Sequence, residues 1–157
     1  MKTLLVTGGC GFIGSNFVRY ILSNEKKCRV VNLDKLTYAG NPENLNDVAD
    51  DKRYIFVKGD ICDEKVVDAI FSDYKPDIVF NFAAESHVDR SIGKPDDFIR
   101  ADMFGVFTLL EAMKQHGGEL FVQISTDEVY GSIEKGEFTE EDPLMPSNPY
   151  SASKAGG

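Results

Sequence analysis

The sequence lacks the features that mark membrane-spanning, secreted and disulfide-rich proteins. No apolar run approaches the roughly 20 residues needed to cross a bilayer, and the N-terminus lacks the charged, apolar and cleavable layout of a signal peptide. The three cysteines, Cys10, Cys28 and Cys62, are widely spaced and form no C-x-x-C pair. They indicate neither a disulfide framework nor a zinc site, so we expect no metal and a reducing, cytoplasmic location.

Basic residues are also scarce, with 17 Lys and Arg against 26 Asp and Glu, a net charge of -9. Because this balance repels nucleic-acid backbones and anionic membranes, we expect neither as a partner. What is present is ordinary for a globular chain: 157 residues, 42% of them hydrophobic. That is enough to bury a substantial core, and the glycines do not recur at the period of collagen.

Apolar runs of strand length alternate with amphipathic runs of helix length. The pattern predicts strands over 2–7, 28–33, 54–58, 77–82 and 119–125. It predicts helices over 12–23, from a cap at Asp63 to Tyr74, over 96–115 and from about Tyr150. This alternation favours an α/β fold in which right-handed crossovers produce a Rossmann-type, doubly wound parallel sheet. Ligands of such sheets bind at the carboxyl ends of the strands, so the informative residues should follow each strand.

A glycine-rich turn, Gly8-Gly9-Cys10-Gly11-Phe12-Ile13-Gly14, lies between the first predicted strand and helix. Glycines there permit positive φ and let backbone N–H groups approach a pyrophosphate at a helix N-terminus. The alternative is a turn that only joins strand to helix. Asp34, twenty residues beyond Gly14, favours the first interpretation, because a carboxylate there binds ribose hydroxyls and repels a 2′-phosphate. The predicted cofactor is therefore NAD rather than NADP.

Two other residues near this predicted site have competing interpretations. Lys35 follows the ribose acid and is either a solvated surface lysine, which we favour, or a phosphate ligand. Asp60, after the third strand, either meets the adenine edge or caps a turn.

The fifth predicted strand ends in Ser125-Thr126-Asp127-Glu128, followed later by Tyr150 and Lys154. Adjacent carboxylates at a strand end suit proton transfer, since each shifts the other's pKa. By composition alone, however, a polar turn is the favoured interpretation. Tyr150 and Lys154 are four residues apart and share one helix face. An ammonium so close should lower the tyrosine pKa and make the phenolate a base for a substrate hydroxyl.

These motifs together resemble the extended short-chain dehydrogenases/reductases, and within them the dTDP-glucose 4,6-dehydratases. The narrower resemblance rests on Asp34–Asn41, Ala83–Ile92 and Ser125–Gly131, and it covers essentially the whole chain. It implies NAD-dependent conversion of a nucleotide-linked glucose to a 4-keto-6-deoxy sugar. Tyr150, assisted by Lys154, would take the C4 hydroxyl proton while hydride passes to NAD. Glu128 would then remove the C5 hydrogen while Asp127 protonates the departing C6 oxygen.

The resemblance also implies binding residues. Ser86 and Thr126 would contact the sugar. Cofactor contacts would come from Gly8, Gly11, Phe12, Ile13, Gly14, Asp34, Lys35, Leu36, Thr37, Asp60, Ile61, Phe82, Ala83, Ala84, Glu85, Ser86, Tyr150 and Lys154.

Two residues after the fourth strand are not given a role in the reaction. We expect His87 to be structural and Arg90 to pair with Asp89 or another surface acid.

The chain departs from the family pattern on its long helix. The family usually has Thr-Asn and, four residues after the Asn, a second Thr; here these positions are Ala101, Asp102 and Val106. The missing hydroxyl and added charge predict weaker cofactor binding or altered activity. The chain ends three residues past Lys154, so we expect 1–157 to be a partial NAD-binding domain with an incomplete sheet. The sugar-nucleotide domain would lie elsewhere, the full enzyme would be a homodimer, and this portion alone would be inactive.

Two alternatives are open at this stage. Another extended family member, such as a UDP-sugar 4-epimerase or decarboxylase, would share the glycine turn and the Tyr150/Lys154 pair but typically lacks the Asp-Glu pair. A dinucleotide-binding fragment without turnover would need only the turn and the ribose acid.

Overall fold

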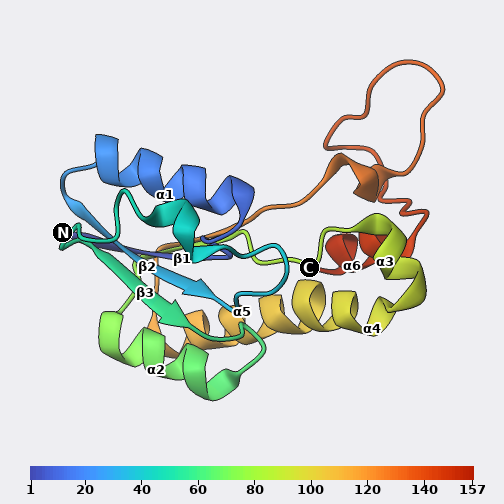
Figure 1. The fold of residues 1–157 in the computed structure, drawn as a ribbon. Coiled ribbons are helices and arrows are strands. Elements are labelled where there is room, and N and C mark those ends of the chain that lie inside the picture. Colours follow the sequence, from blue (N-terminus) through green and yellow to red (C-terminus); the bar gives the residue numbers. More distant parts are fainter.

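A computed structural model describes residues 1–157 and contains one five-stranded parallel sheet (Figure 1). The strand order is β3-β2-β1-β4-β5, so the chain winds outward in one direction and then returns to the centre before winding in the other. The strands are β1 (Lys2–Thr7), β2 (Cys28–Asp34), β3 (Tyr54–Lys58), β4 (Ile78–Asn81) and β5 (Leu120–Gln123). This arrangement confirms the predicted Rossmann-type fold.

Helices cover both faces of this sheet, α1 on one side and α2 and α5 on the other, while α3 and α6 lie beyond the carboxyl ends of the strands (Figure 1). The α-helices are α1 (Phe12–Asn24), α2 (Glu64–Tyr74), α3 (Val88–Gly93), α4 (Pro95–Phe98), α5 (Gly105–His116) and α6 (Pro149–Gly156). Two 3-10 turns, η1 (Pro42–Leu45) and η3 (Asp127–Tyr130), and one π-helical segment, η2 (Ile99–Phe104), complete the elements.

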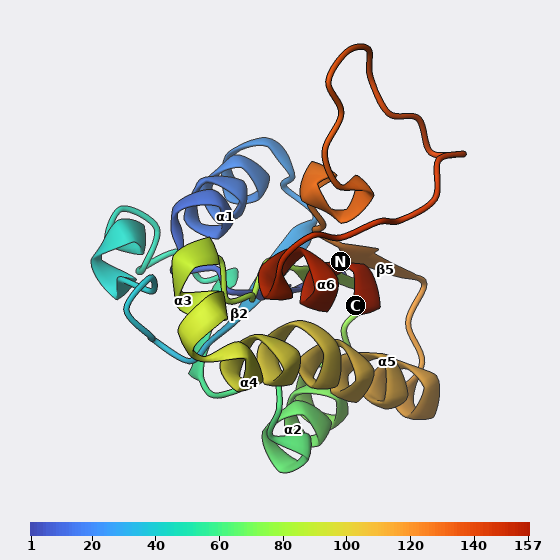
Figure 2. The same cartoon turned by 90° about the vertical axis from the view of Figure 1, so that its right-hand side faces the viewer.

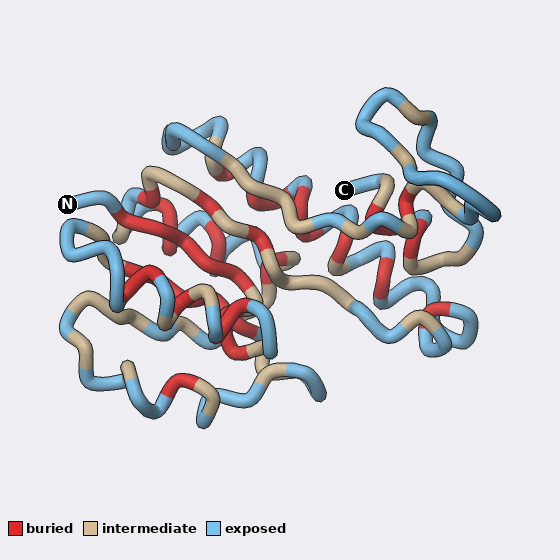
Figure 3. The backbone as a smooth tube through the Cα atoms, turned by 90° about the horizontal axis from the view of Figure 1, so that it is seen from above, coloured by how far each residue is buried: buried red, intermediate tan, exposed pale blue.

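Alternation along the strands gives the sheet two apolar faces. On β1, Leu5 packs with Phe71 of α2 and Leu109 of α5, whereas Leu4 points to the other face and packs with Val18 of α1. Burial is therefore concentrated in the central strands β1 and β2 and in the helix sides that face the sheet, whereas the edge strands β3 and β5 contain no buried residue (Figure 3). The loops that follow the carboxyl ends of the strands are not part of this core, so they are available to form a site.

Local signals set most helix ends. The Asp63 side chain accepts hydrogen bonds from the Lys65 and Val66 amides and caps α2 as predicted. Gly117, with φ of 91°, ends α5. The helix predicted over 96–115 is not regular, because the π-helical segment η2 joins α4 to α5. The short helix α3 was not predicted, since its six polar-rich residues show no helical periodicity.

The segment between η3 and α6 projects away from the rest of the chain (Figure 2). It is acidic and largely exposed, and Tyr130 stacks on Phe138 at its base, with ring centroids 5.4 Å apart. None of the helices combines the length and apolar character needed to span a membrane.

Candidate functional site

A cavity of about 400 Å³ runs along the carboxyl ends of the strands. Its wall contains nearly all of the cofactor residues predicted from the sequence: Gly8, Gly11, Phe12, Ile13, Gly14, Asp34, Lys35, Thr37, Asp60, Ile61, Phe82, Ala83, Ala84, Glu85 and Ser86. Among the residues predicted to contact only the cofactor, Leu36 is the exception, because its side chain packs into the core beneath α1. Tyr150, Lys154 and Thr126 do not line this cavity.

The glycine turn leaves no room for side chains where the backbone must face the cavity. Gly8 has φ of 66°, and a Cβ atom there would lie 2.7 Å from the Ala83 nitrogen. A Cβ atom on Gly14 would lie 2.9 Å from the Gly9 Cα atom, so the first turn of α1 sits directly on the loop. The turn therefore presents backbone N–H groups at a helix N-terminus, the arrangement that binds phosphate.

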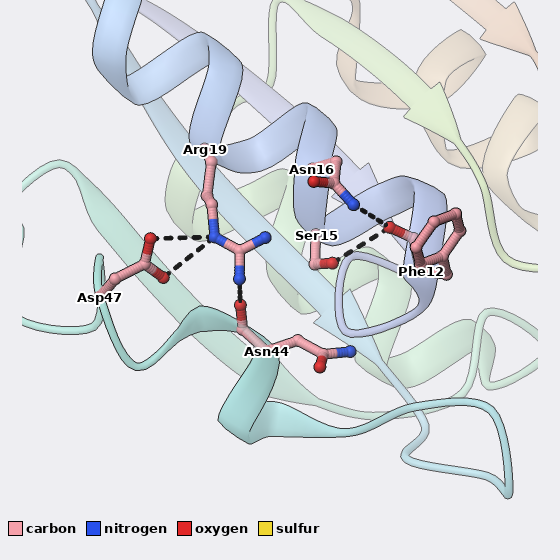
Figure 4. Close-up of polar contacts among 6 residues, drawn as sticks. All are labelled: Phe12, Ser15, Asn16, Arg19, Asn44 and Asp47. Carbon is pink, nitrogen blue, oxygen red and sulfur yellow. Dashed lines mark hydrogen bonds and ion pairs between the residues drawn. The ribbon is translucent and has the colours of Figure 1, made fainter.

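Polar contacts hold this turn from the outside (Figure 4). On α1, the Phe12 carbonyl accepts hydrogen bonds from the Ser15 hydroxyl and the Asn16 amide. Arg19 pairs with Asp47, with Nε 2.9 Å from Oδ2, and donates to the Asn44 carbonyl. The Asn44 side chain in turn donates to the Cys10 carbonyl at 3.0 Å. The segment after β2 is thereby fixed against the glycine turn.

Asp34 is 7% exposed and held by two backbone amides. Its Oδ2 accepts from the Cys10 N–H at 2.9 Å and its Oδ1 from the Leu36 N–H at 2.8 Å. Leu36 adopts φ of 57° to make this turn. Each carboxylate oxygen retains a further lone pair, so Asp34 can accept ribose hydroxyls without rearranging.

Lys35 and Asp60 form an ion pair at the rim, with Nζ 2.7 Å from Oδ2. Lys35 is therefore not simply a solvated lysine. Burial alone would raise the pKa of Asp60, but hydrogen bonds from Lys35 and the Cys62 amide hold it below its ordinary value. Asp60 caps a turn through the Cys62 amide and also lines the cavity, so both interpretations of this residue hold geometrically.

The predicted catalytic carboxylates follow β5 on the turn η3. The Thr126 hydroxyl caps this turn by accepting from the Glu128 N–H at 3.3 Å, and it lies 3.3 Å from the Asp127 Oδ1 atom. The Asn148 side chain donates to Glu128 Oε2 at 3.1 Å. Asn148 also caps α6 through the Ser151 N–H, so one residue connects the carboxylate pair to the helix of Tyr150.

Lys154 is 5% exposed, and its Nζ donates to the Ile124 carbonyl at 2.6 Å. Burial lowers the pKa of Lys154, and the Asp102 carboxylate opposes that change. The prediction that the tyrosine pKa is lowered is wrong for this structure. Burial raises the pKa of Tyr150, the Thr126 hydroxyl lowers it, and the carboxylates of Glu128, Asp102 and Asp127 raise it further.

Sequence reasoning missed several residues of the cavity wall. Asp97 and Arg100 reach it from the long helical run, and Cys62 and Ile124 from strand ends. No motif marks them, because their place depends on how the helix crosses the sheet. Burial raises the pKa of the Cys62 thiol to about 11, so this cysteine is a neutral part of the wall.

His87 and Arg90 contribute to α3 rather than to the cavity lining. His87 is exposed and precedes the helix without capping it through its side chain. Arg90 was expected to pair with a surface acid, but its guanidinium instead stacks over the Tyr38 ring at 4.2 Å from the centroid. No three His, Cys, Asp or Glu side chains are grouped to hold a metal ion.

Comparison with known proteins identifies closely similar chains. The dTDP-glucose 4,6-dehydratase of Neisseria gonorrhoeae is 52% identical over 98% of this chain and 47% of its own length. The low-salt glycan biosynthesis protein Agl12 of Haloferax volcanii is 56% identical over 98% of this chain and 48% of its own length. The crystal structure of DesIV, the dTDP-glucose 4,6-dehydratase of Streptomyces venezuelae, with NAD and TYD bound, superposes with a TM-score of 0.94 at 48% identity, covering 98% and 48% of the two chains.

The chain thus spans about half the length of the relatives it matches. A family model described as GDP-mannose 4,6 dehydratase matches residues 5–157, nearly the whole sequence. The resemblance inferred from the glycine turn and the Ser125–Gly131 motif is confirmed by these relatives. With its fold and its sequence both matching over almost every residue, this chain belongs to the GDP-mannose 4,6 dehydratase family.

Proposed function

We propose that residues 1–157 form the NAD-binding part of a nucleotide-sugar 4,6-dehydratase acting on dTDP-glucose. The observation that carries the proposal is the cavity beneath the glycine turn, with Asp34 fixed in its wall. The relatives named as dTDP-glucose 4,6-dehydratases support dTDP-glucose as the substrate, and the NAD bound to the Streptomyces venezuelae enzyme supports NAD as the cofactor. A further domain would recognise the nucleotide, and the complete enzyme would act as a homodimer without binding nucleic acid.

The residues present fit NAD. The glycine turn packs closely against neighbouring backbone, where a Cβ atom on Gly8 or Gly14 would clash, and its N–H groups at the start of α1 suit a pyrophosphate. Asp34 presents free lone pairs for the ribose hydroxyls. The Lys35–Asp60 pair and Ile61 offer a wall for the adenine. When bound, NAD supplies a hydride acceptor for the sugar C4 and the source of the hydride returned to C6.

Tyr150 would accept the proton of the C4 hydroxyl. Its raised pKa makes this unfavourable unless positive charge lies nearby. Lys154, on the same helix face, would supply that charge when the substrate is bound. The Lys154 ammonium uses one of its three N–H bonds on the Ile124 carbonyl, so two remain for other acceptors. Thr126 would hold the C4 oxygen, and Ser86 would contact the sugar.

Asp127 and Glu128 would carry out the elimination. Once C4 is a ketone, the C5 hydrogen becomes acidic, and Glu128 would remove it while Asp127 protonates the departing C6 oxygen. Glu128 is oriented by the Asn148 amide and Asp127 by the Thr126 hydroxyl. Two carboxylates with different hydrogen-bond partners suit one base and one acid.

The cofactor proposal is tested by titrating the chain with NAD and with NADP in a calorimeter. We expect NAD to bind more tightly than NADP, and Asp34→Ala to reduce the ratio of the two affinities. Asp50→Ala, which alters an exposed acid away from the cavity, is the matched control and should leave the ratio unchanged. No binding of NAD, or an unchanged ratio in Asp34→Ala, would contradict the proposal.

The reaction is tested on this chain joined to the C-terminal half of the Neisseria gonorrhoeae relative. Incubation with dTDP-glucose and with UDP-glucose should give the 4-keto-6-deoxy product from dTDP-glucose, with solvent deuterium incorporated at C5. Glu128→Gln should still oxidise C4 but fail to eliminate water. Epimerisation at C4 without deuterium at C5 would indicate a UDP-sugar epimerase instead, and NAD binding without any product would indicate a binding fragment.

A further inference from the structure

Asp102 is a fully buried carboxylate at the point where three elements meet. It lies in the π-helical segment η2, between α4 and α5, and α6 packs directly against this segment. A Cβ atom on Gly156 of α6 would lie 2.6 Å from the Met103 Cε atom, which shows how closely the two elements approach. Figure 2 shows α6 lying along the run from α4 to α5.

Each carboxylate oxygen of Asp102 holds a different element. Oδ2 accepts from the Ser153 hydroxyl of α6 at 2.8 Å. Oδ1 accepts from the Glu85 N–H at 3.2 Å, in the segment after β4 that lines the cavity. One side chain therefore joins the helix of Tyr150 to the wall of the cofactor cavity.

Neither of these bonds requires a charge. An asparagine at position 102 would accept from the Glu85 N–H through its oxygen and donate to the Ser153 hydroxyl through its nitrogen. A buried carboxylate costs more than a buried amide. The charge therefore has a role beyond joining the two elements, and the group it faces indicates that role.

That group is Lys154, the residue after Ser153. Its ammonium is buried, bonds to the Ile124 carbonyl, and forms no direct ion pair with any acid. The ionisable groups that interact with Asp102 are Lys154 and Tyr150 on α6 and Glu85 after β4. Among them Lys154 alone is a cation, so the Asp102 charge compensates a second buried charge of opposite sign.

We propose that Asp102 is a positioning residue whose carboxylate fixes α6 against the cavity wall and keeps the buried Lys154 side chain charged. Its significance for catalysis rests on the proposed role of Lys154 beside Tyr150. The proposed effect of the Asp102 charge on Lys154 does not depend on that role, because it is argued from the burial of both residues and from their contacts. Burial raises the pKa of Asp102 to about 6, while Ser153 and Lys154 lower it, so the carboxylate is predominantly ionised at neutral pH.

The test is an NMR titration of the Lys154 ammonium in the 157-residue chain, with the signal assigned from a Lys154→Arg spectrum. In Asp102→Asn both hydrogen bonds remain but the charge is gone, so we expect the Lys154 midpoint to move to lower pH. Asp96→Asn removes an exposed acid from the same helical run and should leave the midpoint unchanged. An unchanged midpoint in Asp102→Asn would overturn the proposal.

Two further variants separate the charge from the hydrogen bond. Ser153→Ala keeps the charge and loses one bond, so amide exchange in α6 should rise on the order of tenfold, with the Lys154 midpoint close to that of the unaltered chain. If Asp102→Asn fails to fold, Lys154→Met serves instead: removing the cation should move the Asp102 midpoint to higher pH, and no movement would overturn the proposal. If the unaltered chain does not bind NAD, the proposed function is contradicted, but the results of these titrations still decide the proposal for Asp102.

Discussion

The two parts of the candidate site are built on different principles. The glycine-turn wall, residues 8–14 and 34–41, holds its buried acid with two backbone N–H groups. The region called here the α6 wall, residues 124–130 and 148–154 together with Asp102, lies next to the cavity and lines it only through Ile124. It holds its buried acid with a side-chain hydroxyl and one amide. The first wall is fixed by the local course of the backbone. The second depends on side chains brought together from distant parts of the chain.

This difference matches two kinds of chemistry. The glycine-turn wall presents preformed donors and acceptors to a ligand that has only to bind. In the α6 wall, burial shifts the pKa values of Asp102, Tyr150 and Lys154 away from their ordinary values. Groups with shifted pKa values are what proton transfer requires, and they carry a cost in folding free energy. We therefore expect the two walls to respond differently to substitution and to pH.

The largest effect should come from Gly8→Ala in the glycine-turn wall. An alanine at φ of 66° is strained and would push its Cβ atom into the Ala83 backbone. We expect a loss of about 2–4 kcal/mol in the free energy of unfolding and loss of NAD binding. Chemical denaturation and calorimetry measure these two effects. Gly93→Ala is the control, because nothing lies within 4 Å of a Cβ atom there; equal losses in both variants would refute the explanation.

The next effect belongs to the α6 wall and depends on pH. The pKa of Asp102 is raised from 3.8 to about 6 in the folded chain. The folded state therefore binds the proton more tightly, and the contribution of Asp102 to stability falls as pH rises from about 4 to about 6. Asp102→Asn removes this cost and keeps both hydrogen bonds, so it should stabilise the chain by about 3 kcal/mol at pH 7.

This gain should disappear near pH 4, where Asp102 is protonated in the folded state. Thermal unfolding of the unaltered chain and of Asp102→Asn between pH 4 and pH 7 measures this stability difference. A stability difference that stays constant with pH would show that the Asp102 charge carries no folding cost. The glycine-turn variant Gly8→Ala, which alters no ionisable group, should lose the same amount of stability at both pH values.

The same contrast explains which features were predictable from sequence. The strands were placed almost to the residue, because continuous apolar runs such as Leu4-Leu5-Val6 leave little choice of structure. The glycine-turn wall was also predictable, since its residues follow one another along β1, α1 and β2. Its one misplaced member, Leu36, lies in a turn whose positive φ directs the side chain into the core.

The α6 wall was predictable only in part. Motif spacing placed Tyr150 and Lys154 on one helix face, but the tyrosine pKa was predicted in the wrong direction, because burial and three carboxylates could not be read from the Tyr150–Lys154 spacing. The contact between Asp102 and Ser153 spans 51 residues and depends on the π-helical segment η2. No periodicity in the sequence marks that segment.

The smallest effect concerns the stack of Arg90 on Tyr38, which joins the turn after β2 to α3. Tyr38 is 55% exposed and Arg90 is also exposed, so the cation–π attraction should contribute about 0.5–1 kcal/mol. A double-mutant cycle with Arg90→Ala and Tyr38→Ala, measured by denaturant unfolding, gives the coupling between them. Arg90→Lys should retain part of that coupling, because the ammonium keeps the charge but lacks the flat face that stacks on the ring. A coupling near zero would mean that this stack does not help to hold α3 against the glycine-turn wall.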